Sequence, residues 1–139
     1  MPTIPELMRQ NLLGVFNERD PERRSVVVAQ TYAEDAVFHD PERTVTGRAA
    51  IGAAAQAVLD GAPGFVFTPR GPLYESAGSL GALPWQFGPE GSDPVVTGMD
   101  IALVEDGLIA TLHTLVDSAA TGSSVAGDEL VLDGGRDQV

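Results

Sequence analysis

The chain contains no cysteine and only two histidines, His39 and His113, among its 139 residues. Without cysteine it can form no disulfide, no thiolate nucleophile and no sulfur-ligated metal site. The two histidines fit no metal-binding spacing, and the sequence has no calcium-binding Asp-x-Asp-x-Asp-Gly loop. These absences predict a protein without a metal site.

Basic residues and long apolar runs are also scarce. Lysine and arginine together number 8, against 20 aspartates and glutamates, which gives a net charge of −12. Such a surface repels the phosphates of nucleic acids and of anionic membranes. No apolar run reaches the roughly 18 residues that span a bilayer, and the start of the chain, Met1–Glu6, does not resemble a signal peptide. We therefore expect no nucleic-acid partner, no membrane partner and a cytoplasmic location.

The sequence predicts helices first and strands afterwards. Thr3 and Glu6 form a capping-box pattern ahead of apolar residues at helical spacing, so a first helix is expected over about residues 4–17. Asp20, followed by proline, predicts the start of a second helix, and an alanine-rich stretch predicts a third over about residues 48–60. Strands are expected at residues 36–39, 65–67, 73–75, 83–87, 95–104 and 108–116, the last two joined by a hairpin.

This order of elements indicates an α+β fold, with about three N-terminal helices packed on one face of a mostly antiparallel sheet. The length suits a single core, and we assign residues 1–117 to one domain. Residues 118–139 are small, polar and rich in glycine, and we predict that they form a flexible tail.

Two aspartates carry the most informative chemical signal. Asp40 lies near the end of the run Tyr32–Pro41, and Asp100 interrupts the apolar stretch Val95–Val104. A carboxylate in apolar surroundings costs several kcal/mol if it stays charged and unpaired, so it usually becomes neutral or takes part in chemistry. Two such acids on different strands are the components of an acid/base site. The structural alternatives are a turn for Asp40 and an exposed edge or ion pair for Asp100.

These residues resemble the ketosteroid isomerases, members of the wider SnoaL-like group with the nuclear transport factor 2-like conical fold. The resemblance covers roughly residues 4–117 and rests on Tyr32–Pro41, Thr46–Arg48, Gly81–Trp85 and Asp100–Ile109. It implies a strongly curved sheet that encloses an apolar pocket beneath the helices. It also implies a homodimer formed through the outer face of the sheet, near Thr111 and His113, and we expect His39 on that face too.

By this resemblance, Asp40 is the general base that moves a proton between substrate carbons. Asp100 is the protonated acid that donates a hydrogen bond to the substrate oxygen. Phe16 stands where the family has its main oxyanion-hole tyrosine and Ala55 near a supporting tyrosine, whereas Tyr32 remains. Phenylalanine donates no hydrogen bond, and the loss of one such donor typically costs about 100- to 1000-fold in rate. The replacements imply a drier, roomier pocket for a bulky apolar substrate other than a steroid.

The leading hypothesis is a cofactor-free acid/base enzyme, a double-bond isomerase or a cyclase, acting on a bulky apolar carbonyl compound such as a polyketide or other secondary-metabolite intermediate. One alternative is an epoxide-opening hydrolase or cyclase that uses the same two carboxylates. Another is a non-catalytic module that binds an apolar ligand. The residues expected to contact the small apolar substrate are Phe16, Tyr32, Phe38, Trp85, Leu112, Thr114 and Val116, and Tyr74 is a further phenol whose place the sequence does not give.

Overall fold

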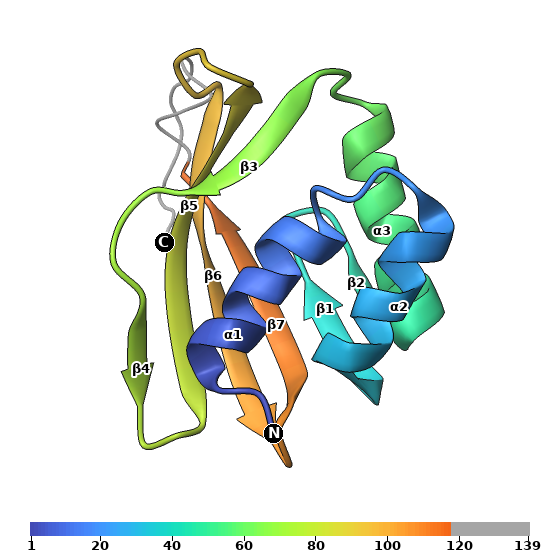
Figure 1. The fold of residues 1–139 in the computed structure, drawn as a ribbon, viewed down its shortest axis with the longest axis vertical. Coiled ribbons are helices and arrows are strands. Elements are labelled where there is room, and N and C mark those ends of the chain that lie inside the picture. Colours follow the sequence, from blue (N-terminus) through green and yellow to red (C-terminus); the bar gives the residue numbers. More distant parts are fainter. Residues whose placement is uncertain (118–139) are drawn as a thin grey trace.

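The computed structural model describes residues 1–117, in which helical segments pack on one side of a seven-stranded sheet (Figure 1). The helical segments are α1 (Ile4–Arg9), η1 (Gln10–Val15), α2 (Pro21–Thr31) and α3 (Arg48–Asp60). The strands are β1 (Tyr32–His39), β2 (Thr44–Thr46), β3 (Phe65–Pro69), β4 (Tyr74–Ser76), β5 (Leu80–Pro89), β6 (Val96–Glu105) and β7 (Leu108–Val116). The predicted tail, residues 118–139, lies outside the described residues.

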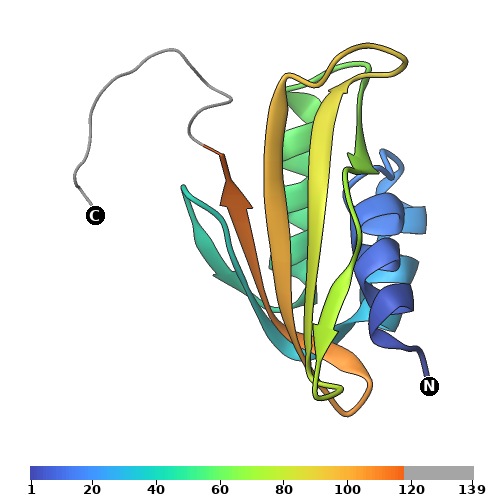
Figure 2. The same ribbon diagram turned by 90° about the vertical axis from the view of Figure 1, so that its left-hand side faces the viewer.

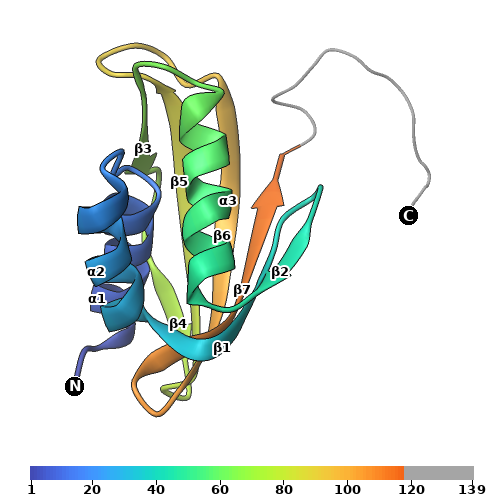
Figure 3. The same ribbon diagram turned by 90° about the vertical axis from the view of Figure 1, so that its right-hand side faces the viewer.

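The sheet is mixed but mostly antiparallel. Its strand order is β2-β1-β7-β6-β5-β3, with β4 paired to β5, and only the β1–β7 pairing is parallel among the described strands. Figure 3 shows α3 in front of β5 and β6, and Figure 2, from the other side, shows those two strands in front of α3. The predicted α+β class is therefore confirmed, whereas the strong curvature of the sheet stays a prediction.

The first helix is present but changes type halfway. Thr3 caps it in both directions with Glu6, as the sequence predicts, and α1 then continues directly into the π-helix η1. The wider turn is visible in the hydrogen bond from the Phe16 amide to the Asn11 carbonyl, five residues back, at 3.1 Å. Apolar spacing marks a buried helical face but does not distinguish the two helix types.

The region around β1 differs most from the expected boundaries. The second helix ends at Thr31, and Tyr32 already opens β1, four residues before the predicted strand. The short strand β2 was not predicted; it pairs with β1 across a turn closed by the Asp40 amide and the Arg43 carbonyl at 3.0 Å. A three-residue strand is too short to show alternation in the sequence.

The core lies between the helices and the inner face of the sheet. Its largest fully buried side chains include Tyr32, Phe38, Leu7, Met8, Leu12, Ile51 and Leu59. At the β6–β7 hairpin, Asp106 and Gly107 both have positive φ, 52° and 77°, as a tight turn of this kind requires. None of the helices in residues 1–117 has the length and hydropathy needed to cross a bilayer.

Candidate active site

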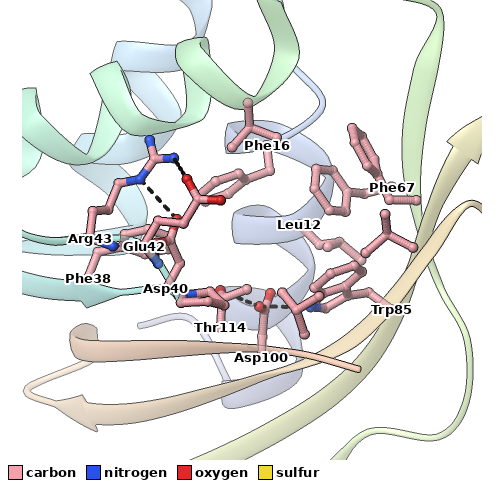
Figure 4. Close-up of a pocket in the computed structure, with 15 residues that line it drawn as sticks. Leu12, Phe16, Phe38, Asp40, Glu42, Arg43, Phe67, Trp85, Asp100 and Thr114 are labelled. Carbon is pink, nitrogen blue, oxygen red and sulfur yellow. Dashed lines mark hydrogen bonds and ion pairs between the residues drawn. The ribbon is translucent and has the colours of Figure 1, made fainter. Parts of the chain in front are cut away.

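A cavity of about 430 Å³ lies between the helices and the inner face of the sheet (Figure 4). Its wall is mostly apolar and contains both predicted acids, Asp40 and Asp100, although 60 positions separate them in the sequence. The lining residues are Leu12, Phe16, Phe38, Asp40, Pro41, Glu42, Arg43, Val58, Phe67, Trp85, Phe87, Val96, Asp100, Thr114 and Val116. An apolar cavity with a few polar groups is the usual form of a small-molecule site.

Asp100 lies on β6 and is only 3% exposed. Its Oδ1 accepts hydrogen bonds from the Thr114 hydroxyl at 2.8 Å and from the Trp85 indole N–H at 3.0 Å, and its Oδ2 accepts one from the Asn11 amide at 3.3 Å. Strand register explains the first contact, because Asp100 and Thr114 are directly paired residues of β6 and β7. The buried acid is therefore hydrogen-bonded from a helix and two strands.

Opposing effects set the protonation of Asp100. Burial raises its pKa from 3.8 to about 6, while the hydrogen bonds from Thr114, Trp85 and Asn11 act in the other direction because they stabilise the charged form. The net shift has the direction expected for a carboxyl group in apolar surroundings. At neutral pH, however, an acid with a pKa of about 6 is mostly a carboxylate, poised to accept a proton and release it again.

Trp85 reaches Asp100 because a glycine faces its ring. Gly98 lies opposite Trp85 in the β5–β6 register, and a Cβ there would overlap both the indole ring and the Leu115 carbonyl oxygen. Any larger residue at this position would displace the indole from β6. Gly98 is therefore part of the site, although it contributes no polar atom to it.

Asp100 is also connected to buried polar groups that are not among the cavity-lining residues. Asn11, on η1, is 1% exposed and receives a hydrogen bond on its Oδ1 from the Tyr32 hydroxyl. Burial, and to a smaller extent the negative charge of Asp100, raise the pKa of the Tyr32 phenol well above its usual value, so the phenol stays neutral and donates its proton. Asn11 was not predicted as a site residue, although an asparagine among the apolar residues of the first helix is a signal that could have revealed it.

Asp40 has a different environment, in the turn between β1 and β2. Its Oδ1 accepts the backbone N–H groups of Glu42 and Arg43 at 2.9 and 2.8 Å, and its Oδ2 lies 3.1 Å from Arg43 Nε. Asp40 is thus a turn residue, as the structural alternative anticipates, and it also lines the cavity. These hydrogen bonds and the ion pair of its carboxylate all come from the next three residues of the chain.

The other predicted contact residues divide into two groups. Five of them line the cavity, namely Phe16, Phe38, Trp85, Thr114 and Val116. Tyr32 and Leu112 are fully buried but lie outside the lining. Phe16 stacks on Phe38 with ring centroids 5.5 Å apart, so this part of the cavity wall is apolar and offers no hydrogen-bond donor from the Phe16 side chain.

Neither histidine contributes to this cavity. His39 and His113 pair across the parallel strands β1 and β7, and their rings stack at 4.4 Å. Tyr74, which is 60% exposed on β4, is also outside the lining, so it does not replace the missing phenol. Within residues 1–117, no three histidine, aspartate or glutamate side chains gather closely enough to hold a metal ion.

Comparison with known proteins identifies the family. A model of the SnoaL-like domain matches residues 10–112. The chain belongs to the SnoaL-like family. The resemblance stated from the sequence is therefore confirmed. A comparison with curated proteins finds no significant match.

Several solved structures share this fold. A protein proposed to be a SnoaL-like isomerase, from Agrobacterium tumefaciens, is 26% identical over 81% of this chain and 95% of its own, with a TM-score of 0.74. A proposed polyketide cyclase from Sinorhizobium meliloti is 23% identical over 80% and 94%, with a TM-score of 0.63. A nuclear transport factor 2-like protein of unknown function from Cytophaga hutchinsonii is 14% identical over 86% and 94%, with a TM-score of 0.61.

Proposed function

We propose that this SnoaL-like protein is a cofactor-free acid/base enzyme, a double-bond isomerase or cyclase, acting on a bulky apolar carbonyl compound. The observation that carries the proposal is Asp100, a buried carboxylic acid with a pKa of about 6 in the wall of a largely apolar cavity. Burial of an ionisable group inside a cavity is costly, and it is found mainly where the group has a chemical task. The relatives proposed to be an isomerase and a polyketide cyclase support the same reaction classes.

The hydrogen bonds of Asp100 favour the role of proton acceptor. The Trp85 indole N–H can only donate, and the hydroxyl of Thr114 donates to the same oxygen, so both hydrogen bonds stabilise the charged form of Asp100. In an isomerisation, it would take a proton from the carbon beside the carbonyl group, leave an enolate, and return the proton to another carbon of the conjugated system. A base with a pKa near the working pH can perform both transfers.

Asp40 and Arg43 would form the polar end of the cavity. Arg43 is the one cationic side chain among the lining residues, and its ion pair with Asp40 fixes its place. A guanidinium at this position can stabilise negative charge that develops on the substrate oxygen, a task that Phe16 cannot perform. This assignment differs from the one implied by the family resemblance, in which Asp40 is the base and Asp100 is the acid. Here Asp100 would be the base, Arg43 would stabilise the oxyanion, and Asp40 would hold Arg43 in place.

The experiment is an ultraviolet assay with a β,γ-unsaturated steroid ketone and smaller β,γ-unsaturated ketones, in which isomerisation produces a conjugated enone band. We expect the rate to increase as pH rises through about 6, because the carboxylate form of Asp100 is the active base. A rate that decreases over the same range would return Asp100 to the role of acid. Apolar-ligand binding without turnover, indifferent to pH and to both aspartates, would instead favour a binding module.

Epoxide opening is the second candidate, because both carboxylates line one cavity. One carboxylate would activate water or a hydroxyl group while the other protonated the epoxide oxygen. Product analysis separates the candidates, since epoxide opening yields a diol or a cyclic ether whereas isomerisation yields only a rearranged double bond.

We also propose that two copies pair through the outer face of the sheet, the face seen in Figure 2. Register places Leu103 opposite Thr111 and Leu115 opposite Met99 on this face, and the two leucines are 43% and 50% exposed. Exposed leucines on adjacent strands form the apolar patch that a homodimer would bury. Analytical ultracentrifugation of the wild type and of Leu115→Glu tests this, with a dimer that becomes a monomer as the expected result.

A further inference from the structure

The two oxygens of Asp100 have unequal environments. Oδ1 accepts two hydrogen bonds, at 2.8 and 3.0 Å, whereas Oδ2 accepts only the longer one from Asn11 at 3.3 Å. A proton added to Oδ1 would displace a donor, while Oδ2 keeps a free lone pair. The next proton therefore belongs on Oδ2, and the side chain that contacts Oδ2 is Asn11.

The orientation of Asn11 is fixed from its other end. The Tyr32 hydroxyl donates to Asn11 Oδ1, so the amide NH₂ group must face Asp100. Tyr32 is fully buried and neutral, and its one proton is committed to this hydrogen bond. The resulting chain runs from the Tyr32 phenol through the Asn11 amide to Asp100 Oδ2.

The backbone places Asn11 where this chain can form. Asn11 is the second residue of the π-helix, and its carbonyl accepts the wide-turn hydrogen bond from the Phe16 amide. Single π-turns within helices are frequently found at functional sites, because they redirect side chains that a regular helix would place elsewhere. Gly14 allows the same segment to pack closely against α2. A Cβ at this position would come within 2.8 Å of a Val27 methyl group and push the helix away from α2.

We propose that Asn11, held by Tyr32, is a positioning residue that presents Asp100 Oδ2 as the oxygen exchanging the proton with the substrate. This proposal rests on the proposed function and deepens it. The hydrogen bond from Asn11 stabilises the carboxylate more than the protonated acid, because the hydroxyl oxygen of a carboxylic acid is a weaker acceptor than a carboxylate oxygen. Asn11 therefore keeps Asp100 ready to accept a proton, and the neutral phenol of Tyr32 keeps the amide from turning around.

The surroundings of Asp100 leave few other charges to consider. The groups in contact with its carboxylate come from η1, β5 and β7 and are Asn11, Trp85 and Thr114, none of which titrates in the relevant range. The charge of Asp100 also acts on Tyr32, at the junction of α2 and β1, and the other charged side chains that line the same cavity are Asp40, Glu42 and Arg43. A titration that is absent in Asp100→Asn can therefore be attributed to the carboxyl group of Asp100 and not to these neighbours.

Trp85 provides a direct reporter of that titration. It is the only tryptophan of the chain, and its indole N–H donates to Asp100 Oδ1. In a protein labelled with ¹⁵N, the single indole signal in the NMR spectrum will move as Asp100 gains a proton. The measurement needs no substrate, so it is independent of whether an enzyme assay has been found.

The experiment compares the indole titration of the wild type with Asn11→Leu, Tyr32→Phe and the control Gln10→Leu. Gln10 is the neighbouring residue of the π-helix, and it accepts a hydrogen bond from Thr31 at 3.1 Å instead of contacting Asp100. We expect Asn11→Leu to raise the midpoint by about one pH unit, the size of one hydrogen bond to a charged group. Tyr32→Phe should raise it by a smaller amount and Gln10→Leu should leave it unchanged.

Two results would overturn the proposal. One is a midpoint in Asn11→Leu and Tyr32→Phe equal to that of the wild type; the other is an equal shift in the Gln10→Leu control. If Asn11→Leu fails to fold, the midpoint of the indole titration in the conservative Tyr32→Phe variant alone tests the proposal. Once a substrate is known, the pH–rate profile should move with the indole midpoint. A shifted midpoint in a protein that turns over no carbonyl compound would support the positioning role and contradict the proposed function.

Discussion

The two aspartates of the cavity, Asp100 and Asp40, are held by different kinds of contact. Asp100 receives its hydrogen bonds from residues of η1, β5 and β7, whereas Asp40 receives its contacts from Glu42 and Arg43 in its own turn. The first arrangement requires the complete tertiary fold, and the second requires only a local turn. We therefore expect substitutions that affect Asp100 to change catalysis and stability more than substitutions that affect Asp40.

The largest effect is expected from Asp100→Asn. Asparagine keeps the approximate size of the side chain but cannot accept a proton, so we expect turnover of a β,γ-unsaturated ketone to decrease about 1000-fold, within the range for general acid–base groups. The measurement is the rate of enone formation, with circular dichroism to verify the fold. A variant that retains more than a tenth of the wild-type rate would remove Asp100 from the mechanism.

The next effect concerns stability and its dependence on pH. Because the folded-state pKa of Asp100 is about 6 rather than 3.8, the folded protein holds this proton more tightly than the unfolded chain does. The associated stability is fully present below about pH 4 and is lost as pH rises through 6, a change on the order of 3 kcal/mol.

Urea denaturation of the wild type and of Asp100→Asn from pH 4 to 8 measures this contribution of Asp100 to the free energy of unfolding. Other carboxylates titrate in both proteins, so the difference between the two unfolding free energies isolates Asp100. We expect the wild type to lose stability relative to the variant with increasing pH. A difference that is constant over this range would show that burial does not raise the pKa of Asp100.

A smaller effect is expected from Gly98→Ala, which separates Trp85 from Asp100. The added methyl group would overlap the indole ring and the Leu115 carbonyl, and such overpacking typically costs about 1–3 kcal/mol. The expected results are a lower free energy of unfolding and a displaced indole NMR signal. The matched control is Gly52→Ala on α3, where the added Cβ would come within 4 Å of no atom apart from its chain neighbours and the nearby backbone of its own helix. Equal stabilities of the two variants would show that Gly98 is not required for the position of Trp85.

Local sequence signals predicted the elements that depend on local chemistry. The capping box of Thr3 and Glu6 and the Asp20 cap, which accepts the Arg23 amide at 2.9 Å, are present as predicted. The third helix, from Arg48 to Asp60, also ends before a glycine as expected. Each of these features is decided by side chains within a few residues of one another.

Features that arise from packing between distant segments were harder to predict. In the sequence, Asn11 is one polar residue in an apolar helix and Gly98 is a glycine that interrupts a strand. Their roles depend on the packing of η1, β5 and β6 around Asp100 in the folded protein. The two acids were found because carboxylates are unusual in apolar runs. The partner of Asp40 was missed because an Asp-Pro turn explains the residue without reference to Arg43.

The smallest effect is expected at Asp40, where the roles implied by the resemblance and those we propose differ most. Asp40→Asn keeps an acceptor for the turn N–H groups but removes the charge that pairs with Arg43. If Asp40 only holds Arg43, turnover should decrease about tenfold, the cost of about 1.4 kcal/mol. Arg43→Gln removes the guanidinium itself and should decrease turnover about 100-fold, the lower end of the range for one oxyanion-stabilising group. The double variant should lose little more than Arg43→Gln alone, because Asp40 acts through Arg43. If Asp40→Asn instead abolishes turnover as completely as Asp100→Asn while Arg43→Gln has no effect, Asp40 is the base and the assignment from the family resemblance is correct.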